Sequence, residues 1–348
     1  MKQSRTQDII IKTQFGSAVA DETAALPVCR SRAFDGGLWP KAGVLALLLG
    51  VSLGTSLLTA GEEPHQPKYR FTEIPLPGMG FAVGINDFGL VTGFYTDPAT
   101  GNVLSYLFER GELTTGISAP GATVTALGPA NNRGVESGNY GDLTHQRAVF
   151  HDIRHGTYTP LPEIPDMPFS FGNGINDFGH GSGVAYAAGD FNNGGTGLGL
   201  NWIWDGENYH FYTVPGAVNG AFAAGINNRD QVTGYFVDSS GLPKGFLKDG
   251  TTFTSIAAPG AIYTLAQGIN NQGAVAGSYL DATGNHGFIW YKGKFTTVDA
   301  PVSGSLGTGW YYVNDHGDLA GVYMDSSHAF RAVIAERVDE DADRHDGE

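Results

Sequence analysis

The sequence has only one cysteine and few basic residues, and each of these two shortages excludes a class of function. A single cysteine, Cys29, precedes the long apolar segment of the chain. If that segment is removed, the mature protein has no thiol, which excludes disulfides and cysteine-based metal or nucleophile sites. Only 20 residues are Lys or Arg and the net charge is −15. Nucleic acid, which needs basic stripes, is therefore not an expected partner.

Glycine, by contrast, is abundant. The chain has 52 glycines among 348 residues, about twice the usual share of roughly 7%. Glycine scattered among Tyr, Phe, Thr and Val predicts many short strands joined by tight turns. No P-loop, zinc, dinucleotide or nucleophile-elbow signature is present.

Residues 42–60 form an uncharged apolar run that follows Lys41 and ends in small residues. This pattern is typical of a signal peptide. Residues 1–41, which precede this run, are longer than the basic N-terminal region of an ordinary signal peptide. Either translation starts later, near Val28, or the segment is an uncleaved anchor. Its 19 residues are enough to span a membrane. Both interpretations place the protein in the periplasm or outside the cell, in the second case anchored in the membrane, and a buried helix is the remaining alternative.

The rest of the chain is built from a six-fold repeat. Each copy has an asparagine followed seven residues later by a glycine, and the asparagines recur at spacings of 45, 45, 51, 43 and 44 residues. The asparagines are Asn86, Asn131, Asn176, Asn227, Asn270 and Asn314. The glycines are Gly93, Gly138, Gly183, Gly234, Gly277 and Gly321. A period near 44 with four short strands per copy is typical of propeller blades.

We therefore predict an all-β fold, a six-bladed β-propeller of four-stranded blades over residues 61–335. The last copy stops after its third strand, and residues 69–77 resemble a fourth strand. This N-terminal strand is expected to join the C-terminal blade and close the ring. Residues 1–60 precede the propeller as an extension with the signal peptide or anchor. Residues 336–348 are expected to form an acidic disordered tail.

The third strands carry a short string, His286-Gly-Phe288 and His328-Ala-Phe330, with variants at Lys244–Phe246 and Arg147–Phe150. Together with the asparagine turn, this string resembles the bacterial extracellular HAF-repeat family over about residues 69–335. The resemblance implies an exported repeat protein and implies no activity.

The repeated residues are interpreted as structural. The asparagines suit tight turns, and the mid-strand glycines allow close backbone approach. Aspartates follow the second strands and are interpreted as turn residues rather than Ca²⁺ ligands. These aspartates are Asp97, Asp142, Asp238, Asp281 and Asp325, with Asp190 displaced by an insertion. His286 and His328 are interpreted as hairpin residues rather than general bases.

The repeat is broken in two places, and these supply the candidate binding site. An insertion at 187–197 and an irregular loop at 162–171 are expected to meet on one face of the propeller. Aromatic rings beside Asp and Asn side chains suit the binding of a sugar. The candidate residues are Asp166, Phe169, Phe171, Asp190, Phe191, Asn192, Asn193, Trp202 and Trp204. Asp190 and Asn192 are also weak candidates for Ca²⁺, and no other cofactor is expected. Ordinary variation in loop length is the alternative.

These features predict an exported, non-catalytic binding or scaffold propeller whose partner is a polysaccharide or a cell-surface protein. The alternative is an extracellular hydrolase, lactonase- or glycosidase-like, because propellers host both kinds of function. The regular repeat favours binding, since catalysis needs asymmetric titratable groups in one pocket.

Overall fold

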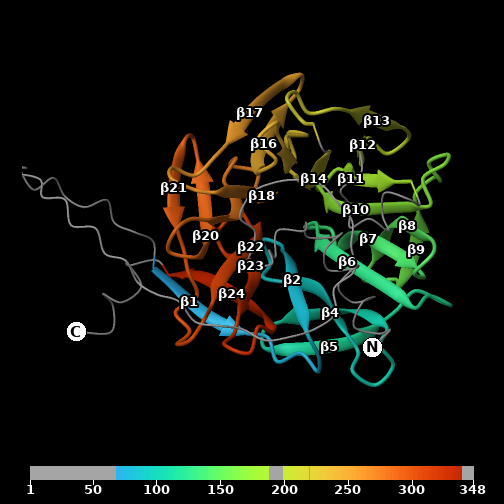
Figure 1. Ribbon diagram of the computed structural model, residues 1–348. Coiled ribbons are helices and arrows are strands. Elements are labelled where there is room, and N and C mark those ends of the chain that lie inside the picture. The colour runs from blue at the N-terminus through green and yellow to red at the C-terminus, as the bar shows by residue number, and fades with distance from the viewer. Residues whose placement is uncertain (1–67, 188–198, 219, 339–348) are drawn as a thin grey trace, which may run out of the picture. The chain divides into compact units, whose positions relative to one another are not determined.

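The computed structural model describes residues 68–187, 199–218 and 220–338 (Figure 1). The apolar segment 42–60, the insertion residues 188–198 and the tail after Val338 lie outside the described residues. The expectations for those segments remain predictions. Within the described ranges, no helix is long and apolar enough to cross a membrane.

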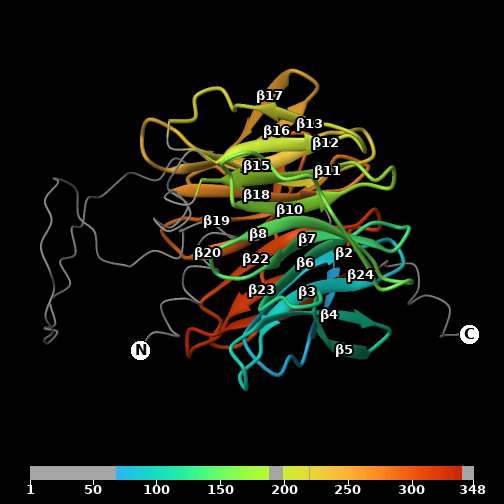
Figure 2. The ribbon, with the colours of Figure 1, turned by 90° about the vertical axis from the view of Figure 1, so that its right-hand side faces the viewer.

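The fold is all-β, and the described residues form 24 strands without a helix. Glycine-rich turns every few residues stop each strand early, so most strands have four to seven residues. Successive strands fall into antiparallel groups arranged around a common axis, and the innermost strand of each group lies closest to that axis (Figure 1). In the perpendicular view β4 and β5 lie on the opposite side of this unit from β16 and β17 (Figure 2).

Each group follows the same order from the axis outwards. The innermost strands are β2 (Gly80–Ile85), β6 (Val124–Ala130), β10 (Phe169–Ile175), β14 (Ala221–Ile226), β18 (Tyr263–Ile269) and β22 (Gly307–Val313). The second strands are β3 (Val91–Thr96), β7 (Val135–Gly141), β11 (Gly181–Tyr186), β15 (Val232–Val237), β19 (Val275–Leu280) and β23 (Leu319–Met324).

The outer half of each group consists of a third and a fourth strand. The third strands are β4 (Val103–Glu109), β8 (Gln146–Asp152), β12 (Leu200–Trp204), β16 (Pro243–Asp249), β20 (Asn285–Tyr291) and β24 (Phe330–Val338). The fourth strands are β5 (Glu112–Ile117), β9 (Thr157–Pro160), β13 (Tyr209–Tyr212), β17 (Thr252–Ile256), β21 (Lys294–Thr297) and, from the start of the chain, β1 (Lys68–Glu73).

The two ends of the described chain meet in one sheet. Strand β1 pairs antiparallel with β24 through six residue pairs, from Lys68↔Val338 to Glu73↔Val333. This pairing confirms that the N-terminal segment adds a strand to the last group. The strand is shorter than the expected 69–77 because it ends at Glu73, ahead of Pro75 and Pro77, which lack the N–H that a ladder needs.

The turn after each innermost strand explains the repeated asparagine. Asn86 lies just beyond the strand, and its Oδ1 accepts hydrogen bonds from the N–H groups of Phe88 and Leu90, at 3.0 and 3.1 Å. Gly89 then adopts φ +77°, a conformation that glycine takes without strain. In the fourth copy Asp230 takes this place at φ +56°. The predicted tight turns are confirmed.

The repeated mid-strand glycines hold the inner two strands close together. A Cβ built on Gly93 would lie 2.0 Å from the carbonyl oxygen of Phe81, and one on Gly183 would lie 2.0 Å from that of Phe171. Side chains of the third strand, such as Tyr106 and Trp202, cover the glycines. The predicted close backbone approach is therefore confirmed.

The core lies between neighbouring groups, because both faces of each inner strand are buried. One cluster joins Val91 and Tyr106 of the first group to Ala320 and Ile334 of the last. The first and last groups thus share a core, as neighbouring groups along the chain do.

Two sequence expectations need correction. Strand β24 continues to Val338, three residues into the segment 336–348 expected to be a disordered tail, because β1 pairs with it that far. The string His328-Ala-Phe330 is also not the counterpart of 286–288. Phe288 lies opposite Gly277, whereas Val333 lies opposite Gly321, so residues 331–333 occupy that position in the last group. His328 lies in the preceding turn, at φ +65°.

Candidate functional site

Three of the residues expected to bind a ligand belong to the core. Phe169, Phe171 and Trp202 are only 1%, 2% and 0% exposed. The two phenylalanines are alternate residues of β10, so they point to the same side of the strand, and there they pack against the next group. Trp202 covers Gly183. These three side chains cannot contact an external ligand, and that part of the prediction is wrong.

The remaining candidates are divided between the surface and the undescribed insertion. Asp166 is exposed in the loop before β10, at φ +63°, and Trp204 at the end of β12 is partly exposed. Asp190, Phe191, Asn192 and Asn193 lie outside the described residues, and so does the suggested Ca²⁺ pair. The loop 161–168 does pack against β12 and β13, because Ile164 and Met167 join the cluster of Trp202 and Tyr209.

An exposed aromatic surface lies on the outer strands of the third group. Tyr209 lies between Trp204 and Phe211, with ring centroids 5.0 and 5.7 Å away, and its ring is stacked on that of Phe211 at 22°. The Tyr209 hydroxyl donates to the carbonyl of Pro162 at 2.9 Å, which fixes the middle ring. Phe211 is 47% exposed. We call Trp204, Tyr209 and Phe211 the outer aromatic surface.

Polar groups of known orientation border this surface. Arg147 donates from Nε to the carbonyl of Leu161 at 2.7 Å, and its Nη1 lies 3.5 Å from Glu163 Oε1. Burial raises the pKa of Tyr209, and the nearby positive charge of Arg147 opposes that shift. A guanidinium and a carboxylate thus lie near a stacked aromatic pair. Tyr209 and Phe211 were not among the predicted binding residues, although the string Tyr-His-Phe-Tyr of β13 is rich in aromatic residues.

The aspartates after the second strands cap their own hairpins. Asp142 Oδ1 accepts the N–H of Thr144 at 2.7 Å, and Asp281 Oδ1 accepts that of Thr283 at the same distance. Lys244 and the Ser240 groups bonded to Asp238 lower the pKa of that carboxyl to about 2. The predicted turn role of the five described aspartates is confirmed.

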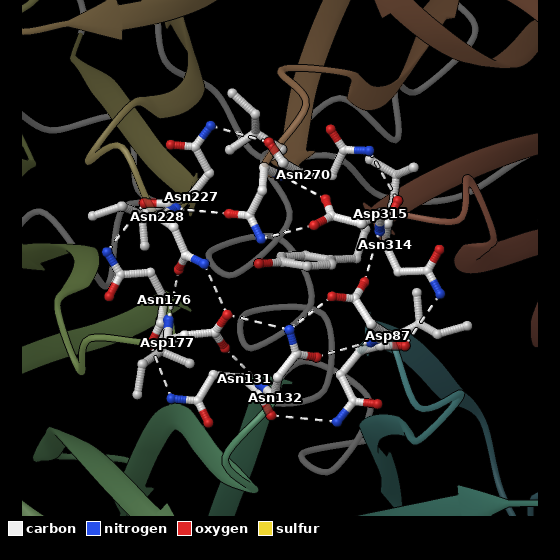
Figure 3. Close-up of a pocket in the computed structure, with 18 of the residues that line it drawn as sticks. Asp87, Asn131, Asn132, Asn176, Asp177, Asn227, Asn228, Asn270, Asn314 and Asp315 are labelled. Atoms are coloured by element: carbon white, nitrogen blue, oxygen red, sulfur yellow. Dashed lines mark hydrogen bonds between the residues drawn. The ribbon is translucent and has the colours of Figure 1, made fainter.

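A second polar arrangement surrounds the axis at the tight turns. Each repeated asparagine uses Nδ2 to donate to the main-chain carbonyl of the equivalent asparagine in the next group. Asn131 donates to Asn176 at 2.9 Å, and Asn314 donates back to Asn86 at 3.1 Å. The six bonds run from each group to the next and return to the first (Figure 3).

The residue after each asparagine forms a second cycle. Its main-chain N–H donates to Oδ1 of the equivalent residue in the next group, at 2.7 to 3.0 Å. These residues are Asp87, Asn132, Asp177, Asn228, Asn271 and Asp315. Asn132 also bridges Asp87 and Asp177 through its amide, at 2.7 and 3.2 Å. Sequence reasoning overlooked this tier, although every copy has Asp or Asn there.

The two cycles surround a pocket of about 40 Å³ (Figure 3). Tyr312, which the sixth copy has where the others have glycine or proline, also lines it. Burial and the charges of Asp177, Asp87 and Asp315 raise the pKa of this tyrosine. Across the described part of the chain, no group of three or more His, Cys, Asp or Glu side chains could hold a metal ion.

No protein-family model and no curated protein matches the sequence. Solved structures resemble it at low identity. AofleA from Arthrobotrys oligospora is 12% identical over 78% of this chain and 88% of its own, with a TM-score of 0.48. A mutant of the Aleuria aurantia lectin in complex with Fucα1-6GlcNAc is 10% identical over 77% of this chain and 93% of its own, with a TM-score of 0.44. The β-propeller domain of the Trilobed protease from Pyrococcus furiosus is 10% identical over 76% of this chain and 80% of its own, with a TM-score of 0.41.

Proposed function

We propose that this chain is an exported six-bladed β-propeller that binds carbohydrate without catalysing a reaction. The observation that carries the binding proposal is the outer aromatic surface, where the exposed ring of Phe211 is stacked on Tyr209 beside Arg147 and Glu163.

The six-bladed ring is supported by hydrogen bonds that return to their starting point. Both cycles at the tight turns pass through six equivalent residues before the last group donates to the first. Strand β1 supplies the fourth strand of the last group. Closure removes the unpaired end surfaces that an open array must cover.

The chemistry of the outer aromatic surface suits a sugar. The apolar C–H face of a pyranose packs on an aromatic face, and its hydroxyls need fixed donors and acceptors at the edge. Tyr209 and Phe211 supply the face, Arg147 supplies donors and Glu163 supplies acceptors. Arg147 is held by Leu161 and Tyr209 by Pro162, so little side-chain freedom is lost on binding.

Export is part of this proposal and rests on residues 42–60, which have the pattern of a signal peptide or anchor. Membership of the HAF-repeat family is also proposed. Its support is the asparagine-turn repeat and the strings at 286–288 and 244–246, which share one register position opposite Gly277 and Gly234.

A glycan array followed by titration calorimetry tests the proposal. Phe211→Ala removes one exposed stacking face and should weaken binding about two- to twelvefold, from the roughly 0.5–1.5 kcal/mol of an aromatic contact. Phe178→Ala is the matched control, because this ring is 61% exposed but lies at a tight turn in the same group.

Unchanged affinity in Phe211→Ala, or equal loss in both variants, would contradict the assigned surface. Absence of any glycan ligand for the wild-type protein would contradict the function itself. The hydrolase alternative predicts turnover of a glycoside or lactone by the same samples.

A further inference from the structure

A second cavity of about 40 Å³ lies on the axis, one layer of residues away from the pocket at the tight turns, and Tyr312 lines both. The residues that line this cavity lie where the innermost strands form β-bulges. The pairing of β10 with β11 shifts register between Gly172 and Gly174, and that of β18 with β19 shifts between Ala266 and Ile269. A bulge redirects side chains, and here the bulge residues line the cavity.

The cavity is asymmetric although the repeat is regular. The position three residues before each repeated asparagine is Val83, Gly128, Asn173, Ala224, Gln267 and Tyr311 in the six copies. Three of these residues can form side-chain hydrogen bonds, and they belong to the third, fifth and sixth copies. They are Asn173, Gln267 and Tyr311. A site that must recognise one ligand needs this kind of departure from symmetry.

Gln267 is the unusual member of this layer. The residue is 6% exposed and lines the cavity, and its carboxamide makes no hydrogen bond to any described residue. Its amide nitrogen and oxygen are not completely buried, so they reach the cavity and can pair with an occupant there. Nearby in the same lining, Asn173 donates from Nδ2 to the carbonyl of Ala223 at 2.8 Å. Its Oδ1 accepts no hydrogen bond from the described residues.

The rest of the wall is uncharged and mostly apolar. Phe94, Phe222, Val83 and Pro129 form its apolar part, Tyr311 and Tyr312 also line the cavity, and no Asp, Glu, Lys, Arg or His does. The volume allows about three water molecules, at roughly 10–15 Å³ of cavity for each. An occupant must therefore be small, neutral, partly apolar and able to pair with an amide.

We propose that this axial cavity binds an acetamido group. Its carbonyl oxygen would accept from Gln267 Nε2, its N–H would donate to an amide oxygen of Gln267 or Asn173, and its methyl would pack on the apolar wall. Four heavy atoms match the space of about three waters. The group comes either from a small free amide or from an N-acetylated sugar. The second source rests on the proposed carbohydrate function, and the first does not.

Titration with acetamide, N-acetylglucosamine and glucose separates these sources, with saturation-transfer NMR as the readout because binding is weak. Acetamide should bind the wild-type protein, and N-acetylglucosamine should also bind if the group enters as part of a sugar. Glucose, which lacks the acetamido group, should not compete with acetamide. Gln267→Leu keeps the side chain's size and should weaken acetamide binding about tenfold, because it removes the hydrogen bond from Nε2.

Two further variants make the result decisive. Gln272→Leu is the control, because this exposed glutamine lies in a tight turn and donates to the carbonyl of Asp315. It should bind acetamide as the wild type does. Ala224→Leu should fill the cavity and abolish binding. Phe211→Ala should leave acetamide binding intact, so loss of the outer aromatic surface and loss of this site are distinguishable. No acetamide signal in the wild type, or equal binding by Gln267→Leu, would overturn the proposal.

Discussion

Replacing Asn176 by alanine tests the idea that the tight turns hold neighbouring groups of strands together. The Asn176 Oδ1 accepts the N–H groups of Phe178 and His180, both at 3.0 Å. Its Nδ2 donates to the carbonyl of Asn227 at 3.1 Å and to Asp230 at 2.9 Å. Alanine removes all four hydrogen bonds at a residue that is 3% exposed.

The expected loss follows from the burial of these groups. The carbonyl of Asn227 lies at a buried residue and loses its side-chain donor, while the N–H groups of Phe178 and His180 lie near the surface and regain water. At about 1 kcal/mol net for each of the four hydrogen bonds, the free energy of unfolding should fall by about 4 kcal/mol. The equivalent change Asn270→Ala should have a similar effect, because its contacts to Gln272, Ala274 and Asn314 repeat the pattern.

Guanidinium unfolding followed by tryptophan fluorescence measures this loss, provided that the slope of the transition stays that of the wild type. Asn208→Ala is the control, because this exposed turn asparagine makes no side-chain hydrogen bond to the described residues. Its effect should stay within about 0.5 kcal/mol. A loss below about 1 kcal/mol in both ring variants would show that water replaces the asparagines and would refute the reasoning.

Two other predictions concern strand β1 and a buried acid. Deletion of Lys68–Glu73 removes β1 and exposes the edge of β24, so cooperative melting should be lost. The control Arg70→Ala removes only an exposed ion pair and should melt normally. Native melting of the deletion variant would contradict the proposed closure. Glu136 is 0% exposed and bonded to His151 at 2.7 Å, and burial raises the pKa of its carboxyl above 4.5. A raised pKa means that stability is full at low pH and is lost as pH rises through the folded-state pKa. Glu136→Gln should remove this decline and be more stable than the wild type at pH 7, as urea unfolding between pH 4 and 8 would show, and an unchanged pH profile would refute it.

Much of the fold could be predicted from the sequence because each repeat carries its own turn chemistry. Asn86, Gly89 and Gly93 act within a few residues of themselves, through a side chain that caps a turn, a positive φ and a close backbone approach. Local effects of this kind can be read from spacing alone. The strand 68–73 could be assigned to the last group because the repeat lacked its fourth strand there.

The candidate site was harder to predict because burial depends on neighbouring groups. Phe169, Phe171 and Trp202 looked like binding residues next to an irregular loop. However, the third and fourth groups enclose the two phenylalanines, and the second and third groups enclose Trp202. Tyr209 and Phe211 looked like ordinary strand residues, but β13 is an outermost strand and leaves them accessible. Alternation along a strand gives two faces without saying which one a neighbour covers.

The sequence by itself determined the repeat, the order of the strands within each copy and the turns, since these depend on residues close together in the chain. Only the tertiary structure decided which residues meet across groups. Positions more than 40 residues apart meet in the hydrogen-bond cycles at the tight turns, which include Asp87, Asp177 and Asp315, and in the cavity beside Gln267. Contacts of that kind depend on where the backbone places each group around the axis, and no local pattern of residues encodes that placement.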